Sequence, residues 1–303
     1  MTTTRPAFSS SPDGLHLQSS DSEATPLRVK QAVWTLVLVC GVAILLAHAL
    51  YFRMLMRGHC VDDAYISYRY AEHLAAGRGL VFNPGERVEG YSNLLWVLLL
   101  TGFARMGANL EIVSQVLALG CSVGALLLAV HALRQLFGVH SALLAALVVL
   151  GLAASGYYAA WSVAGLESTL FGFLLLAAWY RFVIEVREGS GALQLLAPLL
   201  ALLALTRPEG VFLALGGVVL RLVLVARRGR PLRGGETLVF VAIVCGTLAL
   251  YEAWRFAYYG PHLFSNSVPP PVVYASIKAL DMVENMPELR ERLMDNTRYF
   301  RKE

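Results

Sequence analysis

The sequence AVWTLVLVCGVAILLAHALYF, residues 32–52, is an apolar run without a charged side chain. As a helix rising 1.5 Å per residue, a run of this length is about 30 Å long, which matches the hydrocarbon layer of a bilayer. It has no small-residue cleavage site of the kind that ends a secretory signal peptide. It therefore predicts a permanent transmembrane helix, and similar runs farther along make the expected fold class an all-α integral membrane protein.

The composition agrees with this class. Hydrophobic residues make up 57% of the chain and charged residues 15%, with a mean hydropathy of +0.58, whereas soluble domains are about half apolar and a quarter charged. A net charge of +4, without a basic block interleaved with aromatic residues, argues against a nucleic-acid partner. The four cysteines do not have the spacing of a disulfide framework or a metal site.

Apolar runs predict a bundle of about seven transmembrane helices. The predicted spans are 32–52, 111–133, 141–161, 165–184, 192–206, 209–226 and 237–257. One more apolar run, from Leu94 to Met106, is too short to cross comfortably. We expect it to lie in the membrane interface or to re-enter the membrane.

The arginines predict the orientation of the chain. If the run from Leu94 does not span, Arg134, Arg187 and the basic loop 226–236 fall on the same side as Arg28, which is cytosolic by the positive-inside rule. The outer side then holds the loop 57–110, the connection around Glu167, the turn Arg207–Glu209, and everything after about residue 258.

Three regions follow from this topology. Residues 1–29, rich in Ser, Thr, Asp and Pro, predict a disordered cytosolic tail. Residues 30–260 form the transmembrane module, with the outer loop 57–110 inserted in it. Residues 261–303 are an extracytoplasmic segment that ends in a charged amphipathic stretch.

The outer loop begins with Asp62 and Asp63, followed by a helical pattern that places Asp62, Ile66, Arg69 and His73 on one face. Asp62 has two interpretations. It caps the helix, the ordinary role of an Asp before a periodic run. Alternatively, the paired carboxylates bind a divalent cation such as Mg²⁺ or Mn²⁺, or one of them is a base for a hydroxyl nucleophile.

The other outer connections also carry charge. Glu167 is either an acid facing a helix N-terminus or a functional group, because a carboxylate in a tight apolar connection is costly unless it is paired. Arg207 and Glu209 could form a plain surface ion pair. Glu252 and Arg255 lie one turn apart and are expected to pair. His48 and His131 lie in apolar runs, where packing is the expected role.

These motifs resemble those of bacterial GT-C membrane glycosyltransferases. The resemblance rests on three motifs, in order: DDAYISYRY at 62–70 continuing to NPGERVEGYSN at 83–93, Trp161 with GLE at 165–167, and TRPEG at 206–210. They are most similar to the branch that contains the terminal arabinofuranosyltransferase of mycobacterial cell walls. The segment after residue 258 carries only part of the usual pattern, and relatives continue with further helices, so a C-terminally truncated member is expected.

The resemblance implies an inverting transferase of the bacterial cytoplasmic membrane, with its active site facing outside. It would move a sugar from a polyprenyl-phosphate donor to an envelope glycan, lipid or protein. Asp62 would be the catalytic carboxylate, and Asp63, Glu167, Arg207 and Glu209 would line the site. Because a sugar phosphodiester needs a base and positive charge for the leaving phosphate, Arg57, Arg207 or a cation would supply that charge.

Two other classes of function remain open. The first is a non-catalytic membrane protein, either a subunit that binds a lipid-linked glycan or a remnant of a longer enzyme. The second is a transporter, which would require ionisable residues near the middle of the membrane, and the apolar runs contain almost none beyond His48 and His131.

Overall fold

A computed structural model describes residues 20–138, 142–188, 195–228 and 234–260, with isolated positions beyond. In these ranges the regular structure is α-helical. The helices are α1 (Ser20–Leu55), α2 (Asp62–Ala75), α3 (Leu94–Arg105), α4 (Leu110–Phe137), α5 (Ala142–Ala154), α6 (Gly156–Trp161), α7 (Ser168–Glu188), α8 (Leu196–Thr206), α9 (Pro208–Arg228) and α10 (Gly234–Tyr259).

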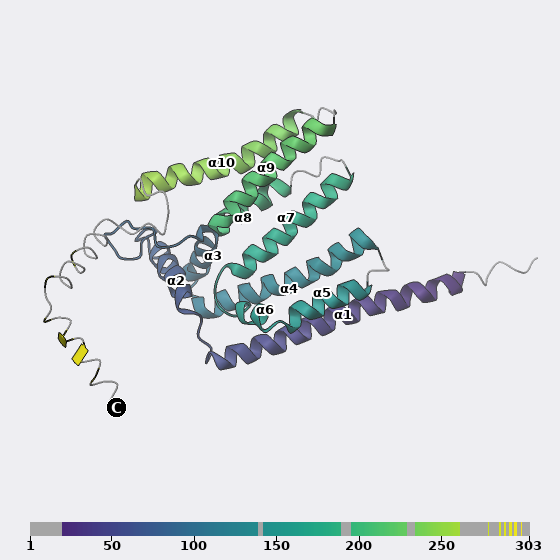
Figure 1. Ribbon diagram of the computed structural model, residues 1–303, viewed down its shortest axis with the longest axis horizontal. Coiled ribbons are helices and arrows are strands. Elements are labelled where there is room, and N and C mark those ends of the chain that lie inside the picture. The colour runs from purple at the N-terminus through teal and green to yellow at the C-terminus, as the bar shows by residue number, and fades with distance from the viewer. Residues whose placement is uncertain are drawn as a thin grey trace, which may run out of the picture.

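The long helices lie side by side in a fan, and α2 and α3 gather at one end of it (Figure 1). Helix α1 packs against α5, α4 against α7, α7 against α8, and α8 against both α9 and α10. Helix α2 packs on α3, which also contacts α4 and α8. The outer loop, the connection before α7, the α8–α9 turn and the end of α10 therefore meet at the same end of the bundle.

Length and composition mark four helices as membrane spans. They are Ala32–Leu55, Leu110–Phe137, Ser168–Arg187 and Gly235–Tyr259. Shorter apolar helices cover Leu94–Arg105, Leu143–Ala154 and Leu196–Thr206. The chain is thus a membrane protein. Each of the seven predicted spans lies mostly in helix where described, but among the described residues only these four helices meet the combined criterion of length and composition.

Two predicted boundaries differ from the structure. The segment 141–161, expected as one span, is divided between α5 and α6, because Ser155 accepts a hydrogen bond from the N–H of Tyr158 and caps a new helix. Helix α1 begins at Ser20, so the end of the region 1–29, for which we predict disorder, is helical. Residues 1–19 and most of 261–303 lie outside the described ranges.

The short helix α3 belongs to the protein interior. With 12 residues it is about 18 Å long, too short to cross the hydrocarbon layer. Trp96, Val97 and Leu100 are fully buried in a cluster that also contains Tyr70 of α2 and Tyr259 of α10. The predicted non-spanning character of this run agrees with its length, and its packing ties the outer loop to the bundle.

The end of α10 holds the outer loop in place. The hydroxyl of Tyr259 donates to the carbonyl of Leu80 at 2.7 Å, and the N–H of Leu80 donates to the hydroxyl of Tyr258 at 3.1 Å. Nearby, Nε of Arg255 donates to Oε2 of Glu89 at 2.6 Å, and both side chains are buried. This ion pair lines a cleft of about 210 Å³ between the loop and helices α8 to α10.

The expected pair of Glu252 and Arg255 is confirmed, at 3.0 Å. However, Glu89 is the partner that shares the interior with Arg255, because the side chain of Glu252 is 58% exposed. His48 is half-buried, as its predicted packing role requires, and its Nδ1 lies 3.1 Å from the carbonyl of Ala153. His131 is exposed and contacts Tyr180, whose hydroxyl lies 3.0 Å from its Nε2.

Replacing Glu89 by Gln should destabilise the protein. Burial raises the pKa of Glu89 more than its hydrogen bond to Arg255 lowers it, so the carboxylate is held at a cost. The amide removes one buried anionic partner of Arg255, which keeps its bond to Glu252, so we expect a loss on the order of 1–3 kcal/mol. The measurement is thermal unfolding in detergent followed by tryptophan fluorescence. Glu252→Gln is the matched control, for which we expect a change below about 1 kcal/mol. Equal shifts for the two variants would contradict the assignment.

Candidate functional site

Asp62 is the first residue of α2, and its carboxylate does not cap that helix. The N-cap position is Val61, which makes no side-chain cap hydrogen bond. The Asp62 side chain is exposed and makes a local hydrogen bond, in which Oδ1 accepts from the N–H of Asp63 at 3.1 Å. The capping interpretation of Asp62 is therefore wrong, because the helix begins one residue earlier than its sequence pattern suggests.

A cleft of about 730 Å³ opens beside Asp62. Its lining comes from α2, from Phe82, from the end of α3, from the turn between α3 and α4, and from the first residues of α4. The lining residues are Asp62, Tyr65, Ile66, Tyr68, Arg69, Glu72, Phe82, Ala104, Gly107, Ala108, Asn109, Leu110 and Glu111. We call this the Asp62 cleft. As predicted, Asp62, Ile66, Arg69 and His73 share one face of α2. The first three line the cleft, whereas His73 is buried with its Nδ1 3.0 Å from the carbonyl of Val81.

A second polar centre surrounds Glu167, whose side chain is buried just before α7. Its Oε2 accepts from Nδ2 of Asn93 at 2.7 Å, and its Oε1 accepts from Nη1 of Arg207 at 3.1 Å. Asn93 also donates to the hydroxyl of Ser67 in α2 at 3.0 Å. Glu167 is thus more than an acid at a helix N-terminus. It links the outer loop to the α8–α9 turn.

Arg207 joins two carboxylates. Besides Glu167, it bonds both oxygens of Glu209 at 3.3 Å, so the predicted surface pair exists but is half of the arrangement. Partial burial alone would lower the pKa of the guanidinium, but the hydrogen bond to Glu209 and the charge of Glu167 outweigh it and raise that pKa. Arg207 is therefore a fixed positive charge in what we call the Glu167 network.

The structure separates the predicted site residues into two groups. Glu167, Arg207 and Glu209 share the Glu167 network, whereas Asp62 lines the cleft. The network reaches α2 at Ser67, five residues beyond Asp62. In an α-helix, that spacing separates the two residues by about 7.5 Å along the helix axis and by about 140° around it. Within the described ranges, the hydrogen bonds of Arg207 go to Glu167, Ser168 and Glu209 and not to Asp62, so the predicted grouping of Asp62 with Arg207 is not seen as a direct contact.

Asp63 and Arg57 are both exposed, and neither is among the residues that line the cleft. Arg57 occupies the left-handed backbone region, with φ of 53°, in the turn between α1 and α2. Within the described residues, no three His, Cys, Asp or Glu side chains converge as a protein-built metal site would require. A cation at Asp62 and Asp63 would need oxygen ligands from water or a phosphate, as Mg²⁺ commonly does.

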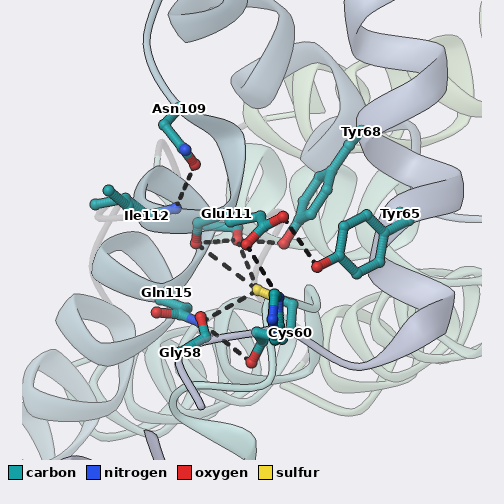
Figure 2. Close-up of polar contacts among 10 residues, drawn as sticks. Gly58, Cys60, Tyr65, Tyr68, Asn109, Glu111, Ile112 and Gln115 are labelled. Atoms are coloured by element: carbon teal, nitrogen blue, oxygen red, sulfur yellow. Dashed lines mark hydrogen bonds and ion pairs between the residues drawn. The ribbon is translucent and has the colours of Figure 1, made fainter. Parts of the chain in front are cut away.

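The sequence analysis missed Glu111 and Tyr65. The hydroxyl of Tyr65 donates to Oε1 of Glu111 at 2.9 Å, and His59 lies 3.9 Å from Oε2 (Figure 2). Burial and the hydrogen bond to Glu111 raise the pKa of the Tyr65 phenol. The available signal was weak: Glu111 begins a transmembrane run and lies 49 positions beyond Asp62, so only folding brings it to the cleft.

A tight contact behind the cleft fixes the start of α2. The N–H of Val61 donates to the carbonyl of Ala164 at 3.1 Å, and the indole of Trp96 donates to that of Gly165 at 3.2 Å. Behind it, Cys60 lies 3.3 Å from Nε2 of Gln115, and Tyr68 bonds Ser114 at 2.5 Å. The connection before α7 therefore determines where Asp62 stands.

Comparison with known proteins gives one long match. The chain is 31% identical over 218 residues to the terminal beta-(1->2)-arabinofuranosyltransferase of Mycobacterium tuberculosis. The match covers 66% of this chain but 33% of that protein, so the chain corresponds to about a third of the enzyme. No family model matches the chain, and no solved structure matches it significantly.

Other matches are short and concern a different class of enzyme. The chain is 58% identical over 43 residues to the 2-amino-3-ketobutyrate coenzyme A ligase of Escherichia coli. It is 56% identical over 43 residues to a related synthase/ligase of Thermus thermophilus. Each covers 14% of this chain and 11% of the enzyme. Fragments of that size do not carry the activity of the whole enzyme.

Gly165→Ala should displace the start of α2. Gly165 has φ of +86°, and an added Cβ would lie 2.5 Å from the Tyr68 hydroxyl and 2.7 Å from Sγ of Cys60. The steric clash adds to the backbone strain, so we expect a loss well above the roughly 1 kcal/mol of strain alone. Gly77→Ala is the matched control, because its φ is +73° and nothing lies within 4 Å. Thermal unfolding of both variants in detergent measures the difference in stability. Similar losses of stability in the two variants would refute the steric clash at Gly165.

Proposed function

We propose that the protein is a membrane glycosyltransferase of the GT-C class and that the sugar is transferred at the Asp62 cleft. The observation that carries the proposal is the position of Asp62. Its carboxylate is released from helix capping and faces a cleft at the end of a membrane bundle. The similarity to an arabinofuranosyltransferase over two thirds of the chain supports the same assignment.

The chemistry of the proposed step fits one carboxylate. An acceptor hydroxyl gives its proton to Asp62 while its oxygen bonds to the anomeric carbon of the donor. The bond from that carbon to the phosphate oxygen breaks, and polyprenyl phosphate leaves with the electron pair. Attack from the face opposite the phosphate inverts the anomeric centre. The leaving phosphate needs no strong general acid, so a base and a nearby positive charge are sufficient.

The membrane gives a reason for the position of this site. A polyprenyl chain stays in the bilayer while its sugar phosphate lies at the boundary, where the bundle ends. Helices α2 and α3, which flank the outer loop, lie at that end (Figure 1), and residues of α2 take part in both the Glu167 network and the cleft. Under the positive-inside rule this end faces outside, as expected for assembly of an envelope glycan at a bacterial cytoplasmic membrane.

The positive charge for the phosphate has three candidate sources. Arg57 is exposed in the turn next to the cleft-lining helix, Arg207 belongs to the Glu167 network, and a divalent cation bound by Asp62 and Asp63 is the third. We favour Arg57, because the guanidinium of Arg207 is already bonded to two carboxylates. Glu167 and Glu209 then position Arg207 and the α8–α9 turn and do not take part in proton transfer.

A non-catalytic role is the second candidate function. The observation that favours it is the match to about a third of the arabinofuranosyltransferase, because residues in the other two thirds of that enzyme have no counterpart in the alignment. Such a chain would bind a lipid-linked glycan through the same cleft without transferring the sugar.

Substitution of Asp62 separates the two functions. Asp62→Asn keeps the shape of the side chain and removes its basicity, so transfer should fall by at least about 100-fold, the lower range for a general base. Binding of the donor should be nearly unchanged. Asp63→Asn is the matched control, and we expect a loss below about tenfold, since Asp63 does not line the cleft. Membranes supplied with polyprenyl-phosphate arabinose or a polyprenyl-phosphate hexose provide the assay.

Retention of full activity in Asp62→Asn would end its assignment as the base. Absence of transfer by the unsubstituted protein with both donors, together with donor binding, would instead establish the non-catalytic function.

The short matches suggest that the end of the chain is separate from this site. Residues 261–303 are 43 in number and follow the last apolar helix, and twelve of them are charged. We infer that this stretch is the one that resembles the coenzyme A ligases and that it contributes nothing to sugar transfer.

A chain ending at Gly260 should therefore transfer sugar at the rate of the full chain, within about twofold. The physical reason is that the described contacts of the outer loop with α10 end at Tyr259. Initial rates at equal amounts of membrane-inserted protein make the comparison. A large loss of transfer without loss of insertion would show that residues 261–303 belong to the transferase.

A further inference from the structure

The Asp62 cleft has an unusual distribution of charge for a site next to a phosphate. Three carboxylates line it, from Asp62, Glu72 and Glu111, against the single guanidinium of Arg69. Nε of Arg69 donates to the carbonyl of Phe82 at 3.2 Å, so part of the hydrogen-bonding capacity of that guanidinium is already used. A phosphate inside the cleft would therefore meet an excess of like charge, which is unfavourable.

A neutral sugar fits the same lining. Carboxylate oxygens accept hydrogen bonds from hydroxyl groups, and such charge-assisted bonds are stronger than neutral ones. The cleft also presents the exposed rings of Tyr65 and Phe82, which give apolar surface to the C–H faces of a sugar. A mostly apolar lining with a few directed polar groups is the usual form of a small-molecule site.

Glu111 is oriented toward this cleft by Tyr65. The phenol donates to Oε1 of Glu111, and the two side chains come from different helices, α2 and α4 (Figure 2). A simpler role for an acid in the first turn of α4 is to interact with the positive end of the helix dipole. However, Asn109 already caps this helix, since its Oδ1 accepts from the N–H of Ile112 at 3.2 Å. The other oxygen of Glu111, Oε2, lies 3.9 Å from Nδ1 of His59, which is beyond hydrogen-bond length, so a ligand hydroxyl can bond that oxygen.

We propose that the Asp62 cleft binds the sugar acceptor as a neutral polyol, with Glu111 accepting a hydrogen bond from an acceptor hydroxyl and Tyr65 positioning Glu111. The phosphate of the donor lies outside this cleft. The assignment of an acceptor rests on the proposed transferase function, whereas the preference for an uncharged glycan does not.

The experiment measures initial rates while acceptor and donor concentrations are varied in turn. The acceptor is an arabinofuranose oligosaccharide, and the donor is polyprenyl-phosphate arabinose. Glu111→Gln should raise the KM for the acceptor about tenfold and leave the KM for the donor within twofold. Tyr65→Phe should raise the acceptor KM by a smaller factor, because Glu111 remains but is less well oriented.

The matched control is Glu86→Gln, because Glu86 is an exposed carboxylate of the outer loop that does not line the cleft. It should change neither KM. An unchanged acceptor KM in Glu111→Gln would overturn the proposal, and so would equal increases for donor and acceptor. A fall in kcat with unchanged KM would assign Glu111 a structural role and also overturn it.

A binding measurement keeps the test independent of transfer. The purified full-length protein is titrated with the radiolabelled oligosaccharide and with the same oligosaccharide carrying a terminal phosphate. We expect the neutral form to bind at least fivefold more tightly, and Glu111→Gln to reduce that preference. Binding without transfer would refute the transferase and retain the neutral-glycan site. Tighter binding of the phosphorylated form would refute the site itself.

Discussion

The hydrogen bond from the N–H of Val61 to the carbonyl of Ala164 places the start of α2 against the connection that precedes α7. Gly165 allows this approach, because any side chain there would occupy the space of Tyr68 and Cys60. The orientation of α2 then decides which residues face the cleft and which face the interior. Asp62 reaches the cleft because the hydrogen bond between Val61 and Ala164 fixes the backbone immediately before it.

The membrane imposes the wider arrangement. Backbone groups in lipid must bond within their own helix, so irregular and charged segments collect where helices end. The outer loop is held at this end of the bundle by the packing of α2 on α3 and by the aromatic residues at the end of α10. The buried pair of Glu89 and Arg255 belongs to the same attachment. Because the Glu89 carboxylate must meet the Arg255 guanidinium, this ion pair favours one orientation of the loop.

Much of the fold was accessible from the sequence, because apolar runs report directly on helices in a membrane. The length of the run from Leu94 correctly predicted a short helix. The break at Ser155 was missed because a serine cap inside an apolar run has little weight in a hydropathy pattern. The start of α1 at Ser20 was missed for the opposite reason, since polar residues there hide a continuation of the helix.

The candidate site was only partly predictable. Charged residues in outer connections identified Asp62, Glu167 and Arg207, but their grouping depends on the direction in which α2 presents each side chain. Sequence proximity made Asp62 and Asp63 a pair, whereas in the structure Asp62 lines one cleft together with Glu111, which comes from another helix, and Asp63 does not line it. Contacts between distant segments, such as Asn93 with Glu167, leave no local pattern.

The separation of the two polar centres has a chemical advantage for the proposed step. An arginine bonded to the Asp62 carboxylate would compete with an acceptor hydroxyl for the same lone pairs, and the base would be occupied. In the structure, Arg207 is instead bonded by Glu167 and Glu209. The carboxylate at the cleft is therefore left to the hydroxyl, and the positive charge that meets the phosphate has to approach from outside the cleft. A donor anchored in the bilayer and an acceptor arriving from the aqueous side would reach Asp62 from these two directions.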